Sequence, residues 1–289
     1  MNDRAVRITE VGPRDGLQNE KTIVPAAEKI ALVDALSSAA FPEIEVTSFV
    51  SPRWVPQLAD ATEVLAGIER RDDVVYSALV PNEKGLDRAM AAGVDKLSVF
   101  TAASEEFCQA NLNTDIAGSL ERFQSVFDTA RSDDIPLRGY ISCVVECPYA
   151  GRIDPVAVRD AVARLLDAAG GRIEIALGET LGVAGPEDIE AVLEAVGPIT
   201  PLGGLDLHLH DTRGRAIECV SRALELGVRR FDSSCAGLGG CPYAPGAAGN
   251  LATERLLDHL VREGWETGVD ESSVAEAATL ASRLVGTAD

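Results

Sequence analysis

Short runs of β-branched and apolar residues alternate with longer stretches of helical periodicity, and the alternation repeats eight times along the chain. Strands are predicted over residues 5–10, 43–49, 73–80, 94–100, 136–145, 172–178, 204–210 and 228–233. Helices are predicted over residues 25–40, 56–70, 82–92, 116–131, 155–169, 186–196, 214–226 and 250–263, with a last one over 271–285. Repeated strand–helix units indicate parallel strands joined by right-handed crossovers. Eight units favour a (β/α)8 TIM barrel with an extra C-terminal helix.

Composition narrows the class of protein without changing this picture. No linker or compositional break divides the chain, so residues 1–289 are predicted to form one domain. Acidic residues outnumber basic ones by 46 to 26, which argues against nucleic-acid or membrane partners because both require a basic surface. The six cysteines lack the paired spacings of a zinc site or a disulfide framework. With no signal peptide or membrane span recognised, we expect a cytoplasmic protein with reduced thiols.

Polar residues gather at the carboxyl ends of the predicted strands, where TIM barrels carry their chemistry. The sharpest pattern is His208-Leu209-His210, which uses two of the three histidines. Side chains two apart on a strand point the same way, so both imidazoles are expected inside the barrel. Together with a carboxylate from the first strand, they describe a metal site with open positions. Two histidines hydrogen-bonded within a polar core remain the alternative.

Two further charged groups lie near the same end of the predicted barrel. Asp15 follows Arg14 in the turn after the first strand, where the pair could be merely solvated or could belong to an active site. Glu45 lies in an otherwise apolar strand, and a buried carboxylate needs a partner, for which Arg14 is the obvious candidate. A structural ion pair and a catalytic arginine oriented by Glu45 are both compatible with this pattern. Cys241 could be a nucleophile, although no base can be placed beside it.

Three segments together resemble the signatures of 3-hydroxy-3-methylglutaryl-CoA (HMG-CoA) lyases. They are residues 10–20 (EVGPRDGLQNE), residues 47–57 (TSFVSPRWVPQ), and the cysteine loop 237–244 (GLGGCPYA) that leads to 249–254 (GNLATE). The resemblance extends from residue 7 to about residue 260. It implies a divalent-metal-dependent carbon–carbon lyase that takes an acyl-CoA substrate and cleaves HMG-CoA to acetyl-CoA and acetoacetate.

The resemblance also implies a role for individual residues. The ligands of Mg²⁺ or Mn²⁺ would be Asp15, His208, His210 and Asn250. Arg14 would stabilise the enolate of acetyl-CoA, and Cys241 would transfer a proton to it. Glu45 matches the second-strand glutamate of the family, and Glu179 stands where the family usually has a proton-relay aspartate. Gln18 and Thr180 are expected to contact the substrate.

Three departures from the family pattern put the acyl group in question: Glu146 for a usual glycine, Glu179 for aspartate and Arg213 for tyrosine. A lyase for a longer 3-hydroxy-3-alkylglutaryl-CoA therefore stays open. A condensing synthase that makes a 2-alkylmalate is the alternative from another enzyme class, and a barrel that only binds is the non-enzymatic one. The sequence leaves room for a homodimer without indicating an interface.

Overall fold

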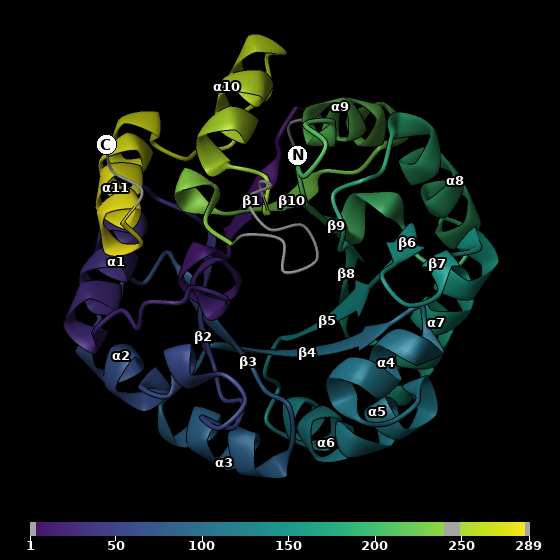
Figure 1. Cartoon of the computed structure of the whole chain (residues 1–289), viewed down its shortest axis with the longest axis horizontal. Coiled ribbons are helices and arrows are strands. Elements are labelled where there is room, and N and C mark those ends of the chain that lie inside the picture. The colour runs from purple at the N-terminus through teal and green to yellow at the C-terminus, as the bar shows by residue number, and fades with distance from the viewer. Residues whose placement is uncertain (1–3, 240–248, 287–289) are drawn as a thin grey trace.

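Eight parallel strands close into a barrel in the order β1-β10-β9-β8-β5-β4-β3-β2 (Figure 1). The computed structural model describes residues 4–239 and 249–286. The barrel strands are β1 (Arg7–Glu10), β2 (Glu43–Ser48), β3 (Val75–Leu79), β4 (Lys96–Ala102), β5 (Leu137–Ser142), β8 (Glu174–Glu179), β9 (Leu205–Leu209) and β10 (Arg230–Ser233). Each lies within one or two residues of a predicted strand or inside it, so the predicted TIM barrel is confirmed.

A ring of helices surrounds the barrel, as Figure 1 shows in the view along its axis. The helices are α1 (Ala26–Ser38), α2 (Ala61–Gly67), α3 (Glu83–Ala91), α4 (Glu105–Leu112), α5 (Ile116–Arg122), α6 (Gln124–Ser132), α7 (Pro155–Ala168), α8 (Pro186–Val196), α9 (Ala216–Leu226), α10 (Thr253–Arg262) and α11 (Glu271–Leu284). The extra C-terminal helix is α11, and it packs between α1 and α10. No helix in the described ranges is long and apolar enough to cross a membrane.

The structure departs from the predicted elements mainly around β4 and β5. Helix α4 follows β4 where no helix was predicted, and the helix predicted over 116–131 is divided into α5 and α6 at Phe123. The strand predicted over 136–145 ends at Ser142, because Cys143 takes a left-handed backbone with φ of 60°. The chain then forms a small hairpin, β6 (Glu146–Cys147) with β7 (Gly151–Arg152), after the carboxyl end of β5.

The hydrophobic core lies between the barrel and the helices, whereas the barrel interior is largely polar. Outward-facing strand residues such as Ile8, Leu207 and Phe231 are buried in one cluster with residues of the surrounding helices. The strand neighbours of Leu207 and Phe231 in the alternating pattern, including His208 and Asp232, face inward. The outer layer therefore stabilises the fold, and the strands point their charged groups at one another across the interior.

Candidate active site

The loop after β1 brings two charged residues to the carboxyl end of the barrel. It is a π-helical turn, Gly12–Gly16, in which the Val11 carbonyl accepts hydrogen bonds from the backbone N–H groups of Arg14 and Asp15 at 3.2 and 2.8 Å. A Cβ on Gly16 would lie 2.7 Å from the Cβ of Leu238, so only glycine lets this loop approach the segment after β10. Such wide turns are frequent at functional sites.

Asp15, His208 and His210 converge at this end of the barrel. The Nε2 atoms of the two imidazoles lie 3.3 Å apart, and the Asp15 carboxylate lies 3.8 Å from Nε2 of His208. One potential ligand atom from each residue falls within 4.8 Å of the others. This arrangement confirms that both histidines point into the barrel and meet the carboxylate of the first loop.

The protonation states of these groups suit metal ligands. Burial, reinforced by the neighbouring His208, lowers the pKa of His210 to about 4 and keeps its imidazole neutral at pH 7. Burial alone would raise the pKa of Asp15, but the Arg14 guanidinium and the histidines hold it well below its usual range. Burial also lowers the pKa of His208, but the hydrogen bond with Asp232 and the charge of Asp15 outweigh it, and the pKa is raised. A metal ion would therefore compete with a proton at His208.

Asn250 completes the donor set that the sequence predicted. Its Nδ2 donates hydrogen bonds to the Asp15 carboxylate at 2.9 Å and to the Leu238 carbonyl at 3.1 Å. The amide oxygen is then the atom of Asn250 that could bind a metal ion. One carboxylate, two imidazoles and one amide oxygen form a set that suits Mn²⁺, and also Mg²⁺ when water fills the other positions. The residues present therefore fit a divalent cation.

Arg14 is held rigidly beside this cluster. Its guanidinium donates to Glu45 and to Asp15, each at 2.5 Å, and lies over the Tyr140 ring at 5.2 Å from the centroid. Glu45 is fully buried and also accepts the Tyr140 hydroxyl at 3.1 Å. The predicted pairing of Arg14 with Glu45 is confirmed, and the guanidinium has a fixed orientation at the site.

The side chains of two predicted residues at the end of β8 contact the neighbouring loops; of the two residues, only Thr180 contacts the cluster, through its backbone at His210. Glu179 pairs in register with Leu209, so it faces the helix layer, and its carboxylate accepts the Val183 N–H at 3.3 Å. Burial raises the pKa of Glu179 to about 7. Its predicted proton-relay role gains no support from this position. The Thr180 hydroxyl accepts the Cys143 N–H at 2.8 Å and so ties the loop after β8 to the end of β5.

The remaining predicted residues lie around the cluster or outside the described ranges. Gln18 is half-buried after the π-helical turn, and no hydrogen bond within the described part of the chain joins it to the cluster. Cys241 lies outside the described residues. Glu146 pairs with Arg152 in the β6–β7 hairpin, and Arg213 is exposed in the loop after β9.

Sequence reasoning missed Arg138, Tyr140 and Asp232, which lie just beneath the cluster. Asp232 accepts from both Arg138 and His208, and Tyr140 contacts Arg14 and Glu45. A signal was present, because polar residues alternate along strands that a barrel buries on both faces, as in Arg138-Gly139-Tyr140 and Arg230-Phe231-Asp232. Period-two polarity in such a strand marks inward-facing groups.

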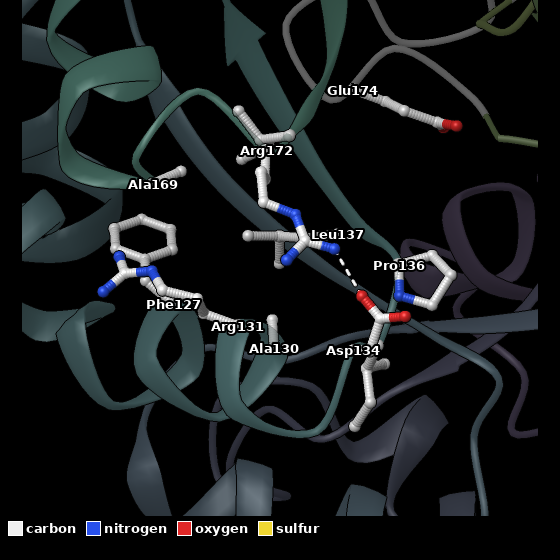
Figure 2. A pocket seen from close by; sticks show the side chains of 11 residues that line it. Phe127, Ala130, Arg131, Asp134, Pro136, Leu137, Ala169, Arg172 and Glu174 are labelled. Atoms are coloured by element: carbon white, nitrogen blue, oxygen red, sulfur yellow. Dashed lines mark hydrogen bonds and ion pairs between the residues drawn. The ribbon is translucent and has the colours of Figure 1, made fainter.

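A cavity of about 460 Å³ lies at the opposite end of the barrel. Figure 2 shows its apolar walls, which include Phe127 and Leu137, and the ion pair of Arg172 with Asp134 at its edge. It sits at the amino ends of β5 and β8, away from Asp15 and the histidines. TIM-barrel chemistry belongs to the carboxyl end, so this cavity is separate from the candidate site.

Comparison with known proteins agrees with this geometry. Residues 5–281 match the HMGL-like family. A mitochondrial hydroxymethylglutaryl-CoA lyase of Bos taurus is 50% identical over 274 residues, which cover 95% of this chain and 84% of that protein.

Solved structures give the same result. The HMG-CoA lyase of Brucella melitensis superposes with a TM-score of 0.95 at 48% identity, covering 98% of this chain and 99% of that one. An HMG-CoA lyase of Acinetobacter baumannii, described as a complex with coenzyme A and 3-methylmalate, has a TM-score of 0.92 at 35% identity, covering 99% and 93%.

Proposed function

The chain belongs to the HMGL-like family of enzymes, and from this premise we propose that it is a divalent-metal-dependent lyase that cleaves HMG-CoA to acetyl-CoA and acetoacetate. The observation that carries the proposal is the convergence of Asp15, His208 and His210 beside the fixed guanidinium of Arg14. The reaction breaks the C2–C3 bond of the substrate. The tertiary hydroxyl loses its proton and becomes the ketone of acetoacetate, and the bonding electrons move to C2 as the enolate of acetyl-CoA.

The metal ligands of the proposed site are Asp15, His208, His210 and Asn250. A bound Mg²⁺ or Mn²⁺ would lower the pKa of the tertiary hydroxyl and fix its orientation. Asp15 also holds Arg14 at 2.5 Å, so the same carboxylate sets the spacing between the hydroxyl end of the substrate and the guanidinium. This shared contact supports a single site for both ends of the bond that breaks.

Arg14 is the group that meets the developing negative charge. Its guanidinium is buried, ionised and oriented by Glu45, Asp15 and the Tyr140 ring. A donor fixed in advance at the thioester oxygen stabilises the enolate without reorganisation during the reaction. Burial alone would lower the pKa of Arg14, but the Glu45 and Asp15 carboxylates hold that pKa above its usual range. Glu45 thereby acts by orienting Arg14.

Cys241 is proposed, from the family resemblance, to deliver the proton that converts the enolate to acetyl-CoA. Gly239, the last described residue before its segment, lies beside Asn250, since a Cβ on Gly239 would fall 2.6 Å from Nδ2 of Asn250. Cys241→Ala should therefore slow turnover while substrate still binds. Undiminished kcat in this variant would exclude the role.

A cytoplasmic location and a homodimer remain part of the proposal.

The direct test is an assay of the purified chain with HMG-CoA and Mg²⁺ or Mn²⁺, with acetoacetate as the readout. Acetoacetate should form with either metal, and EDTA should abolish its formation. Full activity in the chelated enzyme would contradict the metal-dependent mechanism.

A second arm of the assay addresses the acyl group. Longer 3-hydroxy-3-alkylglutaryl-CoA esters compared by kcat/KM test whether Arg213, which is exposed, and Glu146, which is half-buried, change the substrate range. Release of free CoA from acetyl-CoA and a 2-oxo acid would instead identify a condensing synthase.

A further inference from the structure

The barrel interior beneath the candidate site is built from charged side chains, although such interiors are usually filled by branched apolar residues. Asp232 on β10 and Arg138 on β5 are both buried, with 2% and 0% exposure. Their side chains meet across the interior at 2.5 Å, although two strands, β9 and β8, separate β10 from β5. A buried ion pair often contributes little net stability. A second purpose for this one is therefore worth testing.

Asp232 contacts Nδ1 of His208, on the edge of the ring that points away from the cluster. Its carboxylate lies 3.1 Å from Nδ1 of His208, whereas Nε2 of the same ring faces His210 at 3.3 Å. A carboxylate can only accept a hydrogen bond, so it holds the proton on Nδ1 and leaves Nε2 with a free lone pair. In the neutral ring, the nitrogen that faces the cluster is then the one that can act as a ligand.

Arg138 fixes the orientation of Asp232 from the other side. Its guanidinium donates to Oδ1 of Asp232, while Oδ2 faces the imidazole of His208. Arg138 is itself held by Asp206 at 3.5 Å and lies over the Tyr140 ring at 4.8 Å. Because each oxygen of the Asp232 carboxylate has its own partner, rotation of the carboxylate would break its contacts with both Arg138 and His208.

We propose that Asp232 and Arg138 are positioning residues for metal binding, which fix the tautomer and the ring orientation of His208. The inference rests on the proposed metal-dependent function, since it concerns the ligand that His208 provides. Partners of this kind typically change metal affinity by about 10–100-fold when they are removed. Neither residue touches the substrate in this proposal, and both act through His208.

The variant Asp232→Asn gives a sharp expectation. Arg138 can only donate, so the amide oxygen will face Arg138 and the amide NH₂ will face Nδ1 of His208. That geometry makes Nδ1 an acceptor and moves the proton to Nε2, where it blocks the ligand position. The matched control is Asp206→Asn, because Asp206 shares the contact with Arg138 but has no contact with His208.

The experiment measures Mn²⁺ binding to the full chain by electron paramagnetic resonance, without substrate. Asp232→Asn should raise the Kd by about 10–100-fold, and Asp206→Asn should change it by less than about 3-fold. An unchanged Kd in Asp232→Asn, or an equal loss in both variants, would overturn the inference and leave the lyase function standing. If wild type binds no Mn²⁺, the proposed metal dependence fails as well.

A measurement on wild type keeps the inference testable if Asp232→Asn does not fold. Nitrogen-15 NMR of the metal-free chain reports which ring nitrogen of each histidine carries a proton. We expect Nδ1 of His208 to remain protonated at any pH where the chain is folded. His208 signals are assigned by comparison with His208→Gln and His259→Gln. Neutral His208 with its proton on Nε2 would contradict the proposal directly.

Discussion

The barrel interior has an upper half, at the carboxyl ends of the strands, and a lower half, at their amino ends. Both halves carry charged side chains, but the charges are paired in different ways. In the lower half, Lys96 donates to Glu43 at 2.8 Å and to Glu174, so a cation stands between carboxylates. In the upper half, His208 and His210 direct their Nε2 atoms at each other, next to the carboxylate of Asp15. The lower half pairs its carboxylates with cations, whereas in the upper half Arg14 pairs with Asp15 and two imidazole nitrogens, both potential acceptors, face each other.

This difference separates a scaffold from a site. The charges in the lower half are already paired with opposite charges, so substitutions there should affect the free energy of unfolding more than the catalytic reaction. Converging acceptors above are favourable only with a cation or a proton between them. Asp232 and Arg138 lie between the two halves and connect them. Substitutions in each half should therefore produce separable effects.

The largest expected effect is in the upper half. His208→Ala removes one of two imidazole ligands and should lower kcat by about 10³-fold or more, with most of the Mn²⁺ affinity lost. His259→Ala is the control, because His259 lies between α10 and α9 and contacts Ser221 at 3.0 Å, away from the cluster. Steady-state kinetics with saturating metal measures both variants. Turnover of His208→Ala within a few-fold of wild type would refute the ligand assignment.

Arg14→Lys should have the next largest effect. An ammonium cannot reproduce the planar pair of donors that contacts Glu45 and Asp15, so its charge will sit differently at the thioester oxygen. We expect kcat to fall by about 10²–10³-fold while Mn²⁺ still binds. Near-normal turnover would reduce Arg14 to a structural partner of Glu45.

The sequence predicted the barrel and the common face of His208 and His210, because both follow simple periodicities. Strand–helix alternation indicated the barrel, and the spacing of His208 and His210 indicated their common face. Helix α4 and the β6–β7 hairpin were missed because they are insertions after strands, where loop composition carries no period. Glu179 was predicted to lie at the site only because it ends a strand, and the alternation of side chains between the two faces of that strand was not considered. It follows Gly178, which shares the inward face with His208, so the next residue must face outward.

Arg138 and Asp232 could not be assigned a partner from sequence alone. Each is a charged residue in a strand, and their contact depends on the closed barrel, in which β9 and β8 lie between their strands. Their alternation with apolar residues shows the facing direction but not the distance. Long-range pairing of this kind becomes visible only in the assembled barrel.

In the lower half, Lys96→Met should reduce stability and spare the chemistry. It leaves buried Glu43 with Arg7 as its remaining cationic partner, so the cost should be at most about 3–5 kcal/mol, the value for a fully broken buried pair. For a chain of this size, that upper limit corresponds to a Tm lower by roughly 10 °C. Arg131→Met is the control, because its ion pair with Asp128 is exposed and should change the Tm very little. Calorimetry gives the Tm, and kcat measured well below it should stay within a few-fold of wild type. A large fall in kcat for Lys96→Met would show that the lower half is more than a scaffold.

The smallest effect concerns Glu10, a buried carboxylate on the outer side of β1 that ties both loops of the site together. It accepts the backbone N–H of Gly12 at 2.7 Å and of Cys235 at 2.9 Å, and the Thr253 hydroxyl at 2.6 Å. Burial outweighs these bonds and raises its pKa from 4.5 to about 7. Between these two values the folded chain keeps a proton that the unfolded chain releases, so this group makes stability fall as pH rises from about 4.5 to about 7. Glu10→Gln removes that dependence, and its amide oxygen can still accept both N–H bonds. The free energy of unfolding of the variant, relative to wild type, should therefore increase between pH 5 and pH 8 by at most about 3 kcal/mol. Glu179 titrates in both proteins, so its contribution cancels in the difference. Urea titrations at both pH values measure it, and a difference that stays constant or decreases with pH would show that Glu10 is already ionised in the folded protein at pH 5.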